Sequence, residues 1–510
     1  MIDCLLIYPK LGSFDNMVVD PPLSVIYAAV DSVKQGFNVQ ILDLRVIPES
    51  DWEREICSRL EQGVRLVGVS VMTGLPLKYA RQASELVRRK APGVPVVWGG
   101  PHATVLPETV MEPFIDFLVR GYGSQTMAQL IAALRDGGDL AAIPGLSYKD
   151  EQGQPHHNKR IPQHELTHYQ DIPYHLVDIM SPMYTRKYST SRMFPIFSAI
   201  GCPYRCAFCV HPRIYKEING PKWLSYDVEE VLGHIRYVME HFKADHIVFF
   251  DDTSFPDLER MRVFFRRVIE EGLKLTLEFR GARINEIDRM DDEFLELMVR
   301  AGTRFIMVGV ESGSPSVLKR FQKGITREQI LAANAKLARF PQIVPHYNFI
   351  YGSPGETTQE LRETKDLVMD LLRGNPQAYF GFGGDWKPIP GTKMVEIAEQ
   401  EYGFRAPATL DEWIAMDSVD ASAKITYSWY PPGHDNTIKM LQMASFVIDD
   451  KFIKETKGNN AAAFRLIRLL ARIYKPISLF RMRHNFHWFM LEYNVWQLLL
   501  KIIPRMIKAS

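Results

Sequence analysis

The sequence predicts an α/β protein in which an open parallel sheet is followed by a partial (β/α) barrel and then by a mostly helical region. Three observations lead to this fold class. The chain has 510 residues, which is too long for one compact core. Strand-like and helix-like segments alternate twice, first over residues 1–140 and again over residues 191–400. From residue 401 to residue 510 the pattern is mainly helical.

Five short apolar runs near the amino terminus have the length and composition of buried strands. They cover residues 4–8, 39–42, 66–71, 94–98 and 114–119. Helical patterns separate several of them, at residues 24–34, 78–89 and 125–135. Five strands with helical crossovers predict a Rossmann or flavodoxin-like sheet, in which ligands bind beyond the carboxyl ends of the strands.

The middle of the chain begins with residues 141–190, which are rich in Gly, Pro, His and charge and predict a hairpin and a linker. A second series of strand-like runs follows. It comprises residues 195–200, 246–250, 275–279, 305–310 and 344–350. Repeated strand and helix units of this length predict a partial barrel with its chemistry at the carboxyl ends of the strands.

The overall composition excludes several classes of protein. A net charge of +1 and a charged fraction of 24% argue against a globally basic nucleic-acid binder. No apolar run reaches the ~20 residues that cross a bilayer, and the first residues lack the basic and apolar stretches of a signal peptide. We therefore expect a cytoplasmic protein that does not bind nucleic acid.

The carboxyl-terminal segment from Ala461 is basic and aromatic. It holds nine Lys and Arg residues and a single acid, Glu492. The basic residues are Arg465, Arg468, Arg472, Lys475, Arg481, Arg483, Lys501, Arg505 and Lys508, and the aromatic ones include Phe464, Phe480, Phe486, Trp488, Phe489 and Trp496. Two interpretations are open: peripheral helices on a membrane surface, or a helical cap whose charges are solvated.

Three of the five cysteines fall within eight residues, and this grouping is typical of a metal or redox site. Cys202, Cys206 and Cys209 have the spacing Cys-x-x-x-Cys-x-x-Cys directly after a predicted strand, whereas Cys4 and Cys57 are expected to pack in the core. Three thiolates leave one iron of a 4Fe-4S cluster open to another ligand. A zinc site with His211 as fourth ligand is the alternative, although His211 is crowded against Cys209.

This motif, with the aromatic Phe208 before its last cysteine, resembles the signature of the radical S-adenosylmethionine superfamily. The resemblance implies a 4Fe-4S cluster whose free iron binds S-adenosylmethionine and generates a 5′-deoxyadenosyl radical. It also implies that S-adenosylmethionine contacts lie on the motif and at later strand ends. These residues are Phe208, Asp251, Asp252, Arg283, Glu311 and Ser312. A helix cap by Asp252 or Thr253 and a salt bridge by Arg283 are the structural alternatives.

The amino-terminal domain resembles the cobalamin-binding domain that accompanies some enzymes of this superfamily. The resemblance is carried by small residues and glycines at two strand ends. The residues expected to contact cobalamin are Ser70, Met72, Thr73, Gly99, Gly100, Pro101 and His102. An ordinary flavodoxin-like domain would also have such turns.

The sequence departs from the cobalamin-binding pattern in two places. Pro9-Lys10-Leu11-Gly12 stands where other cobalamin proteins carry an axial histidine, so no protein histidine is expected below the cobalt. Gly121-Tyr122-Gly123-Ser124 replaces a turn that normally carries two glutamates. The contacts of those two acids are therefore not expected here.

Together these resemblances, which cover residues 1–400, imply a cobalamin-dependent radical enzyme. The leading prediction is a methyltransferase that acts on an unactivated carbon of a small-molecule or lipid-like substrate. A cyclase or rearrangement enzyme that transfers no methyl group is the first alternative, and a cobalamin- or redox-sensing regulator is the second. The resemblance also implies an electron donor such as flavodoxin or ferredoxin. The substrate itself is not predicted.

Overall fold

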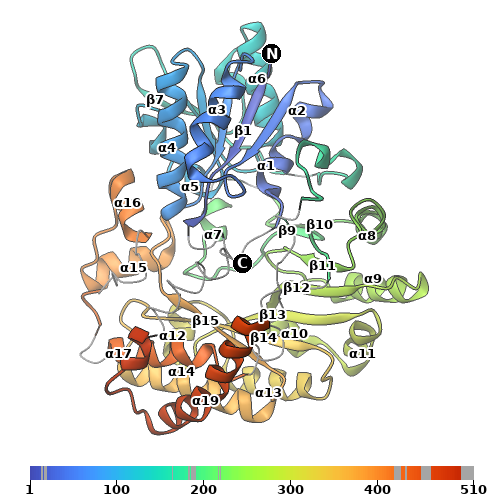
Figure 1. Ribbon diagram of the computed structural model, residues 1–510, viewed down its shortest axis with the longest axis vertical. Coiled ribbons are helices and arrows are strands. Elements are labelled where there is room, and N and C mark those ends of the chain that lie inside the picture. The colour runs from blue at the N-terminus through green and yellow to red at the C-terminus, as the bar shows by residue number, and fades with distance from the viewer. Residues whose placement is uncertain are drawn as a thin grey trace.

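In the computed structural model, two α/β units lie one above the other, and a helical region borders both of them (Figure 1). The structure describes residues 1–510 except 13–14, 16–19, 164, 182–183, 185–190, 216–217, 219, 418–426, 431–433, 450–460 and 496–510. The side chains of residues 382–384, 461–464 and 466–467 are also not described. The α/β class predicted from the sequence is confirmed.

The amino-terminal unit is built on a seven-stranded sheet in the order β2-β1-β3-β4-β5-β6-β7. Its strands are β1 (Cys4–Tyr8), β2 (Val39–Asp43), β3 (Val67–Ser70), β4 (Val96–Gly99), β5 (Phe117–Val119), β6 (Leu146–Lys149) and β7 (Pro155–His157). The first five strands are parallel, and the hairpin β6–β7 continues the sheet in antiparallel fashion. The hairpin expected after residue 140 therefore extends this sheet.

Helices cover both faces of the first sheet (Figure 1). They are α1 (Leu23–Ala28), α2 (Val30–Lys34), α3 (Trp52–Leu60), α4 (Leu75–Lys90), α5 (Pro101–Val105) and α6 (Ser124–Asp136). The single helix expected over residues 24–34 is divided in two at Ala29. Apolar side chains from the two sheet faces form separate cores, one against α3 and α4 and one against α2 and α6.

The second unit is a partial barrel of six parallel strands in the order β15-β14-β13-β12-β11-β8. The strands are β8 (Met193–Ile196), β11 (His246–Phe249), β12 (Thr276–Arg283), β13 (Thr303–Glu311), β14 (Val344–Tyr351) and β15 (Tyr379–Asp385). A separate antiparallel pair is formed by β9 (Ala199–Gly201) and β10 (Trp223–Ser225). The strand expected over residues 195–200 is thus two strands, and β15 was not expected.

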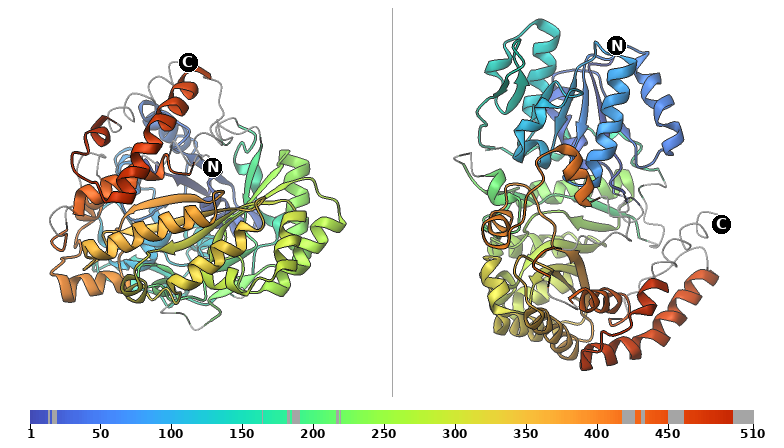
Figure 2. Two further views of the ribbon diagram at one scale, coloured as in Figure 1. Left: turned by 90° about the horizontal axis from the view of Figure 1, so that it is seen from below. Right: turned by 90° about the vertical axis from the view of Figure 1, so that its left-hand side faces the viewer.

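Helices alternate with the strands of the barrel and cover its outer face (Figures 1 and 2). They are α7 (His211–Ile214), α8 (Val228–Phe242), α9 (Leu258–Glu270), α10 (Ile284–Arg289), α11 (Asp292–Arg300), α12 (Pro315–Arg320), α13 (Arg327–Ala338), α14 (Thr358–Gly374) and α15 (Lys393–Tyr402). The short helix α7 lies between the two units, because it follows the cysteine motif at the start of the barrel.

The carboxyl-terminal region is helical but divides between the two units. Helix α16 (Leu410–Asp417) packs on α4, and its Leu410 and Trp413 are buried in the core of the first unit. Helices α17 (His434–Ser445) and α19 (Ala461–His484) pack instead on the barrel beside α14 (Figure 2). None of the helices that the structure describes combines the length and apolarity needed to span a bilayer.

The two units meet where the carboxyl ends of the first sheet approach the start of the barrel. The rings of Tyr27 and Phe197 pack edge to face with their centroids 5.4 Å apart. Leu23 and Ile26 of α1 are buried in the core of the barrel. Arg280 Nη1 lies 3.9 Å from Asp20 Oδ2. The ligand-binding edge of the first sheet is thereby turned toward the cysteine motif.

Candidate functional site

The three cysteines of the motif lie on a loop that is held in place by its own backbone. Strand β9 ends at Gly201, directly before Cys202, and α7 begins two residues after Cys209. The amide of Ala207 donates to the carbonyl oxygen of Phe321 at 2.8 Å, and its carbonyl accepts from the amide of Met394 at 2.9 Å. These contacts anchor the middle of the loop to the opposite side of the barrel, so the thiols are presented on a fixed scaffold.

The electrostatics of the thiols depend on burial and on nearby hydrogen-bond donors. Burial raises the pKa of Cys202 to about 11 and that of Cys209 to about 12, while backbone amides of Tyr204 and His211 oppose these shifts. Cys206 is buried, and its sulfur accepts a hydrogen bond from Arg283 Nη1 at 3.1 Å. A ligated metal must displace the thiol protons, and the amides and the guanidinium would then stabilise the thiolates.

The arrangement fits an iron-sulfur cluster better than a single zinc ion. In the described part of the chain, no three His, Cys, Asp or Glu side chains converge closely enough to hold one metal ion. In a cluster the three thiolates bind three different irons, so they need not converge on one point. His211, the fourth ligand of the zinc alternative, is engaged elsewhere, because its Nε2 lies 2.8 Å from Asp252 Oδ1. The zinc interpretation is therefore not supported.

Asp251 and Asp252, which follow β11, hold the segment that leads into the cysteine loop. Asp251 is buried and accepts from the amides of Ser198 and Ala199 at 2.7 and 3.0 Å, and from the hydroxyl of Ser198 at 2.6 Å. Burial raises the pKa of this carboxyl to about 6. Asp252 accepts from the amide of Gly201 at 3.0 Å. In the structure both carboxylates position the backbone that precedes Cys202. Their contact with S-adenosylmethionine stays a prediction.

Arg283, at the carboxyl end of β12, also faces the cysteine loop. Beyond Cys206, its Nη2 donates to the carbonyl of Lys323 at 2.7 Å, and its guanidinium lies 3.9 Å from the ring centre of Tyr204. The hydroxyl of Tyr204 donates to the buried Glu286 at 3.0 Å. These contacts hold the Arg283 guanidinium beside Cys206, and its contact with S-adenosylmethionine stays a prediction.

Glu311, at the carboxyl end of β13, has the strongest structural mark of a functional residue. Its φ is +68°, a left-handed conformation that is costly for a residue other than glycine. Its Oε1 accepts from Lys323 Nζ at 2.7 Å, and the two side chains are only 10% and 4% exposed. Sequence reasoning missed Lys323, because no local signal marks a lysine that pairs with an acid twelve residues earlier.

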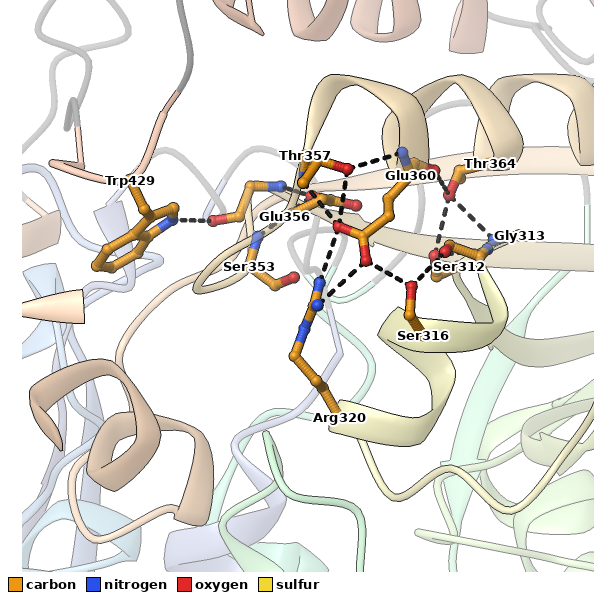
Figure 3. A network of polar contacts seen from close by, with 12 residues as sticks. Ser312, Gly313, Ser316, Arg320, Ser353, Glu356, Thr357, Glu360, Thr364 and Trp429 are labelled. Atoms are coloured by element: carbon orange, nitrogen blue, oxygen red, sulfur yellow. Dashed lines mark hydrogen bonds and ion pairs between the residues drawn. The ribbon is translucent and has the colours of Figure 1, made fainter. Parts of the chain in front are cut away.

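Ser312, beside Glu311, anchors this strand end to helix α14. Its hydroxyl lies 3.0 Å from that of Thr364, which also accepts from the amide of Gly313 at 3.0 Å (Figure 3). In the same network, Glu360 receives both Nη atoms of Arg320 at 3.1 Å. The side chain of Ser312 therefore fixes the turn that carries Glu311, and its contact with S-adenosylmethionine stays a prediction.

Phe208 lies in the barrel, whereas the residues expected to contact cobalamin lie at the carboxyl edge of the first sheet. Phe208 packs edge to face on Phe321, with 5.0 Å between ring centres. At the carboxyl edge of the first sheet, the side chain of Met72 is 47% exposed, and Ser70 Oγ lies 3.1 Å from Ser24 Oγ. An exposed thioether at this edge is suited to contact the apolar face of a corrin ring.

Two other residues expected at the cobalamin site serve the packing of the sheet itself. A Cβ at Gly100 would lie 2.6 Å from the carbonyl oxygen of Val71, so this glycine allows a close approach of two backbones. His102 is 1% exposed, with its Nδ1 3.0 Å from Thr73 Oγ1, and burial lowers its pKa to about 4. Gly99 and Pro101 flank Gly100 at the same turn, before α5.

Among the described residues, the carboxyl edge of the first sheet offers no histidine side chain to a bound cobalamin. His102 is the single histidine of residues 1–140, and it is buried with its ring turned to Thr73. The loop Pro9 to Gly12 supplies no imidazole. An exposed apolar side chain at the strand ends and the lack of an available imidazole are compatible with a corrinoid whose cobalt has no histidine ligand from this domain.

The turn that departs from the cobalamin-binding pattern has a structural purpose of its own. The hydroxyl oxygen of Tyr122 lies 2.9 Å from that of Tyr215, the residue directly after α7. Tyr122 therefore joins the carboxyl end of β5 to the segment that follows the cysteine motif.

Comparisons with known proteins agree with this geometry. Residues 196–368 match the radical SAM superfamily, and residues 12–131 match the B12 binding domain. An uncharacterised methyltransferase of Pyrococcus horikoshii is 29% identical over 401 residues, which cover 77% of this chain and 82% of the relative. An anaerobic magnesium-protoporphyrin IX monomethyl ester cyclase of Synechocystis is 25% identical, with 62% of each chain covered.

Among solved structures, the radical S-adenosylmethionine methyltransferase TsrM of Kitasatospora setae superposes with a TM-score of 0.66 and 21% identity, covering 93% of this chain and 99% of that chain. Fold and site therefore define a radical enzyme with a corrinoid-binding domain. This chain belongs to the cobalamin-dependent radical S-adenosylmethionine enzymes, and its cofactors are a 4Fe-4S cluster, S-adenosylmethionine and cobalamin.

Proposed function

We propose that this enzyme transfers a methyl group to an unactivated carbon of a small molecule. The observation that carries the proposal is the meeting of the two units, since Tyr122 and Tyr215 join the edge of the cobalamin-binding sheet to the segment that follows the cysteine motif. When bound, the cluster and S-adenosylmethionine supply a 5′-deoxyadenosyl radical, and methylcobalamin supplies the methyl group. A carbon radical formed between the units would lie next to the methyl donor.

The chain's own residues hold the parts of this site in register. Asp251 and Asp252 hold the segment that leads into the cysteine loop, and Arg283 places a positive charge beside Cys206. The strained Glu311, fixed by Lys323, presents a carboxylate at the carboxyl edge of the barrel. A carboxylate at that edge is suited to accept hydrogen bonds from S-adenosylmethionine hydroxyl or ammonium groups.

Methyl transfer is favoured over cyclisation by the extent of the similarity. The chain covers 82% of the Pyrococcus methyltransferase but only 62% of the cyclase. The alternative functions also predict different products. Methyl transfer consumes two molecules of S-adenosylmethionine per turnover, one as a radical source and one to restore methylcobalamin, whereas cyclisation consumes only the first.

A labelling experiment separates these two reactions. Reconstituted enzyme, incubated without oxygen with hydroxocobalamin, a reductant and S-adenosylmethionine carrying a deuterated methyl group, is expected to form S-adenosylhomocysteine and 5′-deoxyadenosine in equal amounts once substrate is present. Mass spectrometry would show the deuterated methyl in the product. Formation of 5′-deoxyadenosine and a changed substrate without S-adenosylhomocysteine would instead establish a cyclase or rearrangement enzyme.

The reaction also requires an electron donor, and flavodoxin or ferredoxin has the low potential that reduction of the cluster demands. We further propose that the substrate is lipid-like and that α19 rests on a membrane surface. Four side chains spaced along one face of α19 are exposed: Leu469 by 54%, Ile473 by 57%, Ile477 by 47% and Phe480 by 54%. The cap interpretation requires this apolar face to be packed.

Basic side chains accompany the apolar face of α19. Arg465 and Arg472 are exposed, and Arg468 is half-buried. Trp496, Lys501, Arg505 and Lys508 lie outside the described residues, as do the side chains of Phe464 and Leu466. An exposed apolar face beside basic groups is typical of helices that lie in the interface of an anionic membrane.

Vesicle flotation tests this membrane contact. The protein is expected to bind vesicles that contain phosphatidylserine but not vesicles of phosphatidylcholine alone. Changing Arg465, Arg468 and Arg472 together to Glu should reverse the attraction, since each basic residue contributes ~1 kcal/mol near such a surface. Salt should also weaken the binding.

The matched control changes Arg89, Arg300 and Arg373 to Glu, because these exposed arginines lie on other helices and give the same change of net charge. This variant should float as the wild type does. If the wild type binds neither kind of vesicle, α19 is a cap and the lipid-like substrate loses its support.

A further inference from the structure

Tyr122 is an exposed aromatic residue at the edge of the first sheet where cobalamin is expected. It follows β5, the strand that pairs with β4, and it is 41% exposed. The amide of Gly121 donates to Thr104 Oγ1 at 2.9 Å, and that hydroxyl donates to the carbonyl of Gly100 at 2.8 Å. The turn that carries Tyr122 is therefore tied to the glycine turn of the expected cobalamin site.

The hydroxyl of Tyr122 is held in place although the side chain is exposed. Its oxygen lies 2.9 Å from the hydroxyl oxygen of Tyr215. Burial of the hydroxyl raises the pKa of Tyr122 to about 12, so the phenol is protonated at neutral pH and can donate in this contact. The polar end of the side chain is thus engaged within the protein, which leaves the apolar ring for a contact at the sheet edge.

Tyr215 carries this contact to the backbone beside the first cluster ligand. It is only 6% exposed, and its ring stacks on that of His211 with 6.1 Å between ring centres. Gly201, the residue directly before Cys202, has a φ of +81°, and an added Cβ there would overlap the hydroxyl of Tyr215. Tyr215 is thus enclosed between the helix that follows the cysteine motif and the glycine that precedes it.

These contacts form a continuous path from the sheet edge to the cluster-binding loop. The path runs from Tyr122 through Tyr215 to Gly201. A cluster bound to Cys202 limits the movement of Gly201 and therefore of the Tyr215 hydroxyl packed against it. A side chain that is already held loses less conformational entropy when it binds a ligand. Cluster loading should therefore favour cobalamin binding, and by linkage cobalamin should favour the loaded loop.

We propose that Tyr122 contacts bound cobalamin with its ring and, through Tyr215, links the occupancy of the cobalamin site to the cluster-binding loop. Tyr122 then takes the place of the acids that this turn lacks, and Tyr215 is a positioning residue. An aromatic ring is suited to pack on the apolar surface of a corrin. The proposal depends on the two cofactors and not on methyl transfer, so it can be tested without the substrate.

Anaerobic titration of the full-length protein with hydroxocobalamin, followed by absorbance, tests both parts of the proposal. Dissociation constants are measured with and without the reconstituted cluster. In the wild type the cluster should tighten cobalamin binding about fivefold or more. Tyr122→Ala removes the ring and should weaken binding about tenfold in both forms. Tyr122→Phe and Tyr215→Phe keep the rings, so binding without the cluster should be unchanged, but the effect of the cluster should fall to about twofold or less.

Two other variants are the matched controls. Met72 is expected to contact cobalamin but lies outside the path to Cys202, so Met72→Ala should weaken binding and keep the effect of the cluster. Tyr148 lies on β6 beside the start of β5, and Tyr148→Phe should change neither quantity. Tyr122→Phe and Tyr215→Phe remove the same hydrogen bond, so their combination should lose no more than either one alone.

Loss of iron from the cluster to a chelator gives a second readout. Bound cobalamin should slow this loss in the wild type but not in Tyr122→Phe, because the link between the two sites acts in both directions. Three results would overturn the proposal: a wild-type affinity for cobalamin that is the same with and without the cluster, an unchanged affinity in Tyr122→Ala, or a cluster effect that persists in both phenylalanine variants.

Discussion

Replacing any one of Cys202, Cys206 or Cys209 with Ala is expected to abolish the iron-sulfur absorbance and all reductive cleavage of S-adenosylmethionine. Each variant removes one of the three thiolate ligands of the cluster. Iron and sulfide analysis after anaerobic reconstitution, together with assay of 5′-deoxyadenosine, measures both effects.

The other two cysteines provide the matched controls for this experiment. Cys4 is buried in β1, and Cys57 lies in α3, far from the motif in sequence and outside the barrel. Cys4→Ala and Cys57→Ala should keep the full iron content and cleavage activity. A single variant of the motif that retained an intact cluster and normal cleavage would show that the three thiols are wrongly assigned.

Lys323→Met is expected to have the second largest effect, because it leaves Glu311 buried without its positive partner. Breaking a buried ion pair in this way costs ~3–5 kcal/mol of stability. Cleavage of S-adenosylmethionine should also fall about 100-fold, equivalent to ~2.7 kcal/mol at 1.36 kcal/mol per factor of ten. Denaturant unfolding and the 5′-deoxyadenosine assay measure the two effects separately.

A double variant distinguishes a structural role of this pair from a role in binding. In Glu311→Gln combined with Lys323→Met, no charge is left buried, so most of the lost stability should return. Cleavage should stay low if Glu311 contacts S-adenosylmethionine. Recovery of cleavage along with stability would limit the pair to a structural role. Lys319→Met, an exposed lysine on α12, serves as control and should change neither measurement.

Local signals were sufficient for the parts of the protein that the sequence predicted well. The cysteine spacing lies within eight residues, and the first five parallel strands are short apolar runs, so both could be recognised from neighbouring residues. Strand β15 could not, since its sequence Tyr-Phe-Gly-Phe-Gly-Gly-Asp is rich in glycine and is stabilised by pairing with β14. Tertiary pairing overrode local propensity there.

The candidate site shows the same division between local and distant information. Arg283 was recognised as a functional arginine, but its contact with Cys206 joins residues 77 positions apart. The contact of Asp251 with S-adenosylmethionine stays a prediction, and no local pattern indicated that its carboxylate also accepts hydrogen bonds from the turn between β8 and β9. Residue type and strand end are local properties, whereas the direction of a side chain depends on how distant segments pack.

The docking of α16 on α4 has a consequence for biosynthesis on the ribosome. The first sheet is translated early, but Leu410 and Trp413 complete its core only after the whole barrel has been made. At ~5–20 residues per second, the intervening segment takes roughly tens of seconds to emerge. During that interval the surface of α4 that α16 later covers is exposed, so a nascent chain shorter than about 420 residues should be a preferred client of cotranslational chaperones.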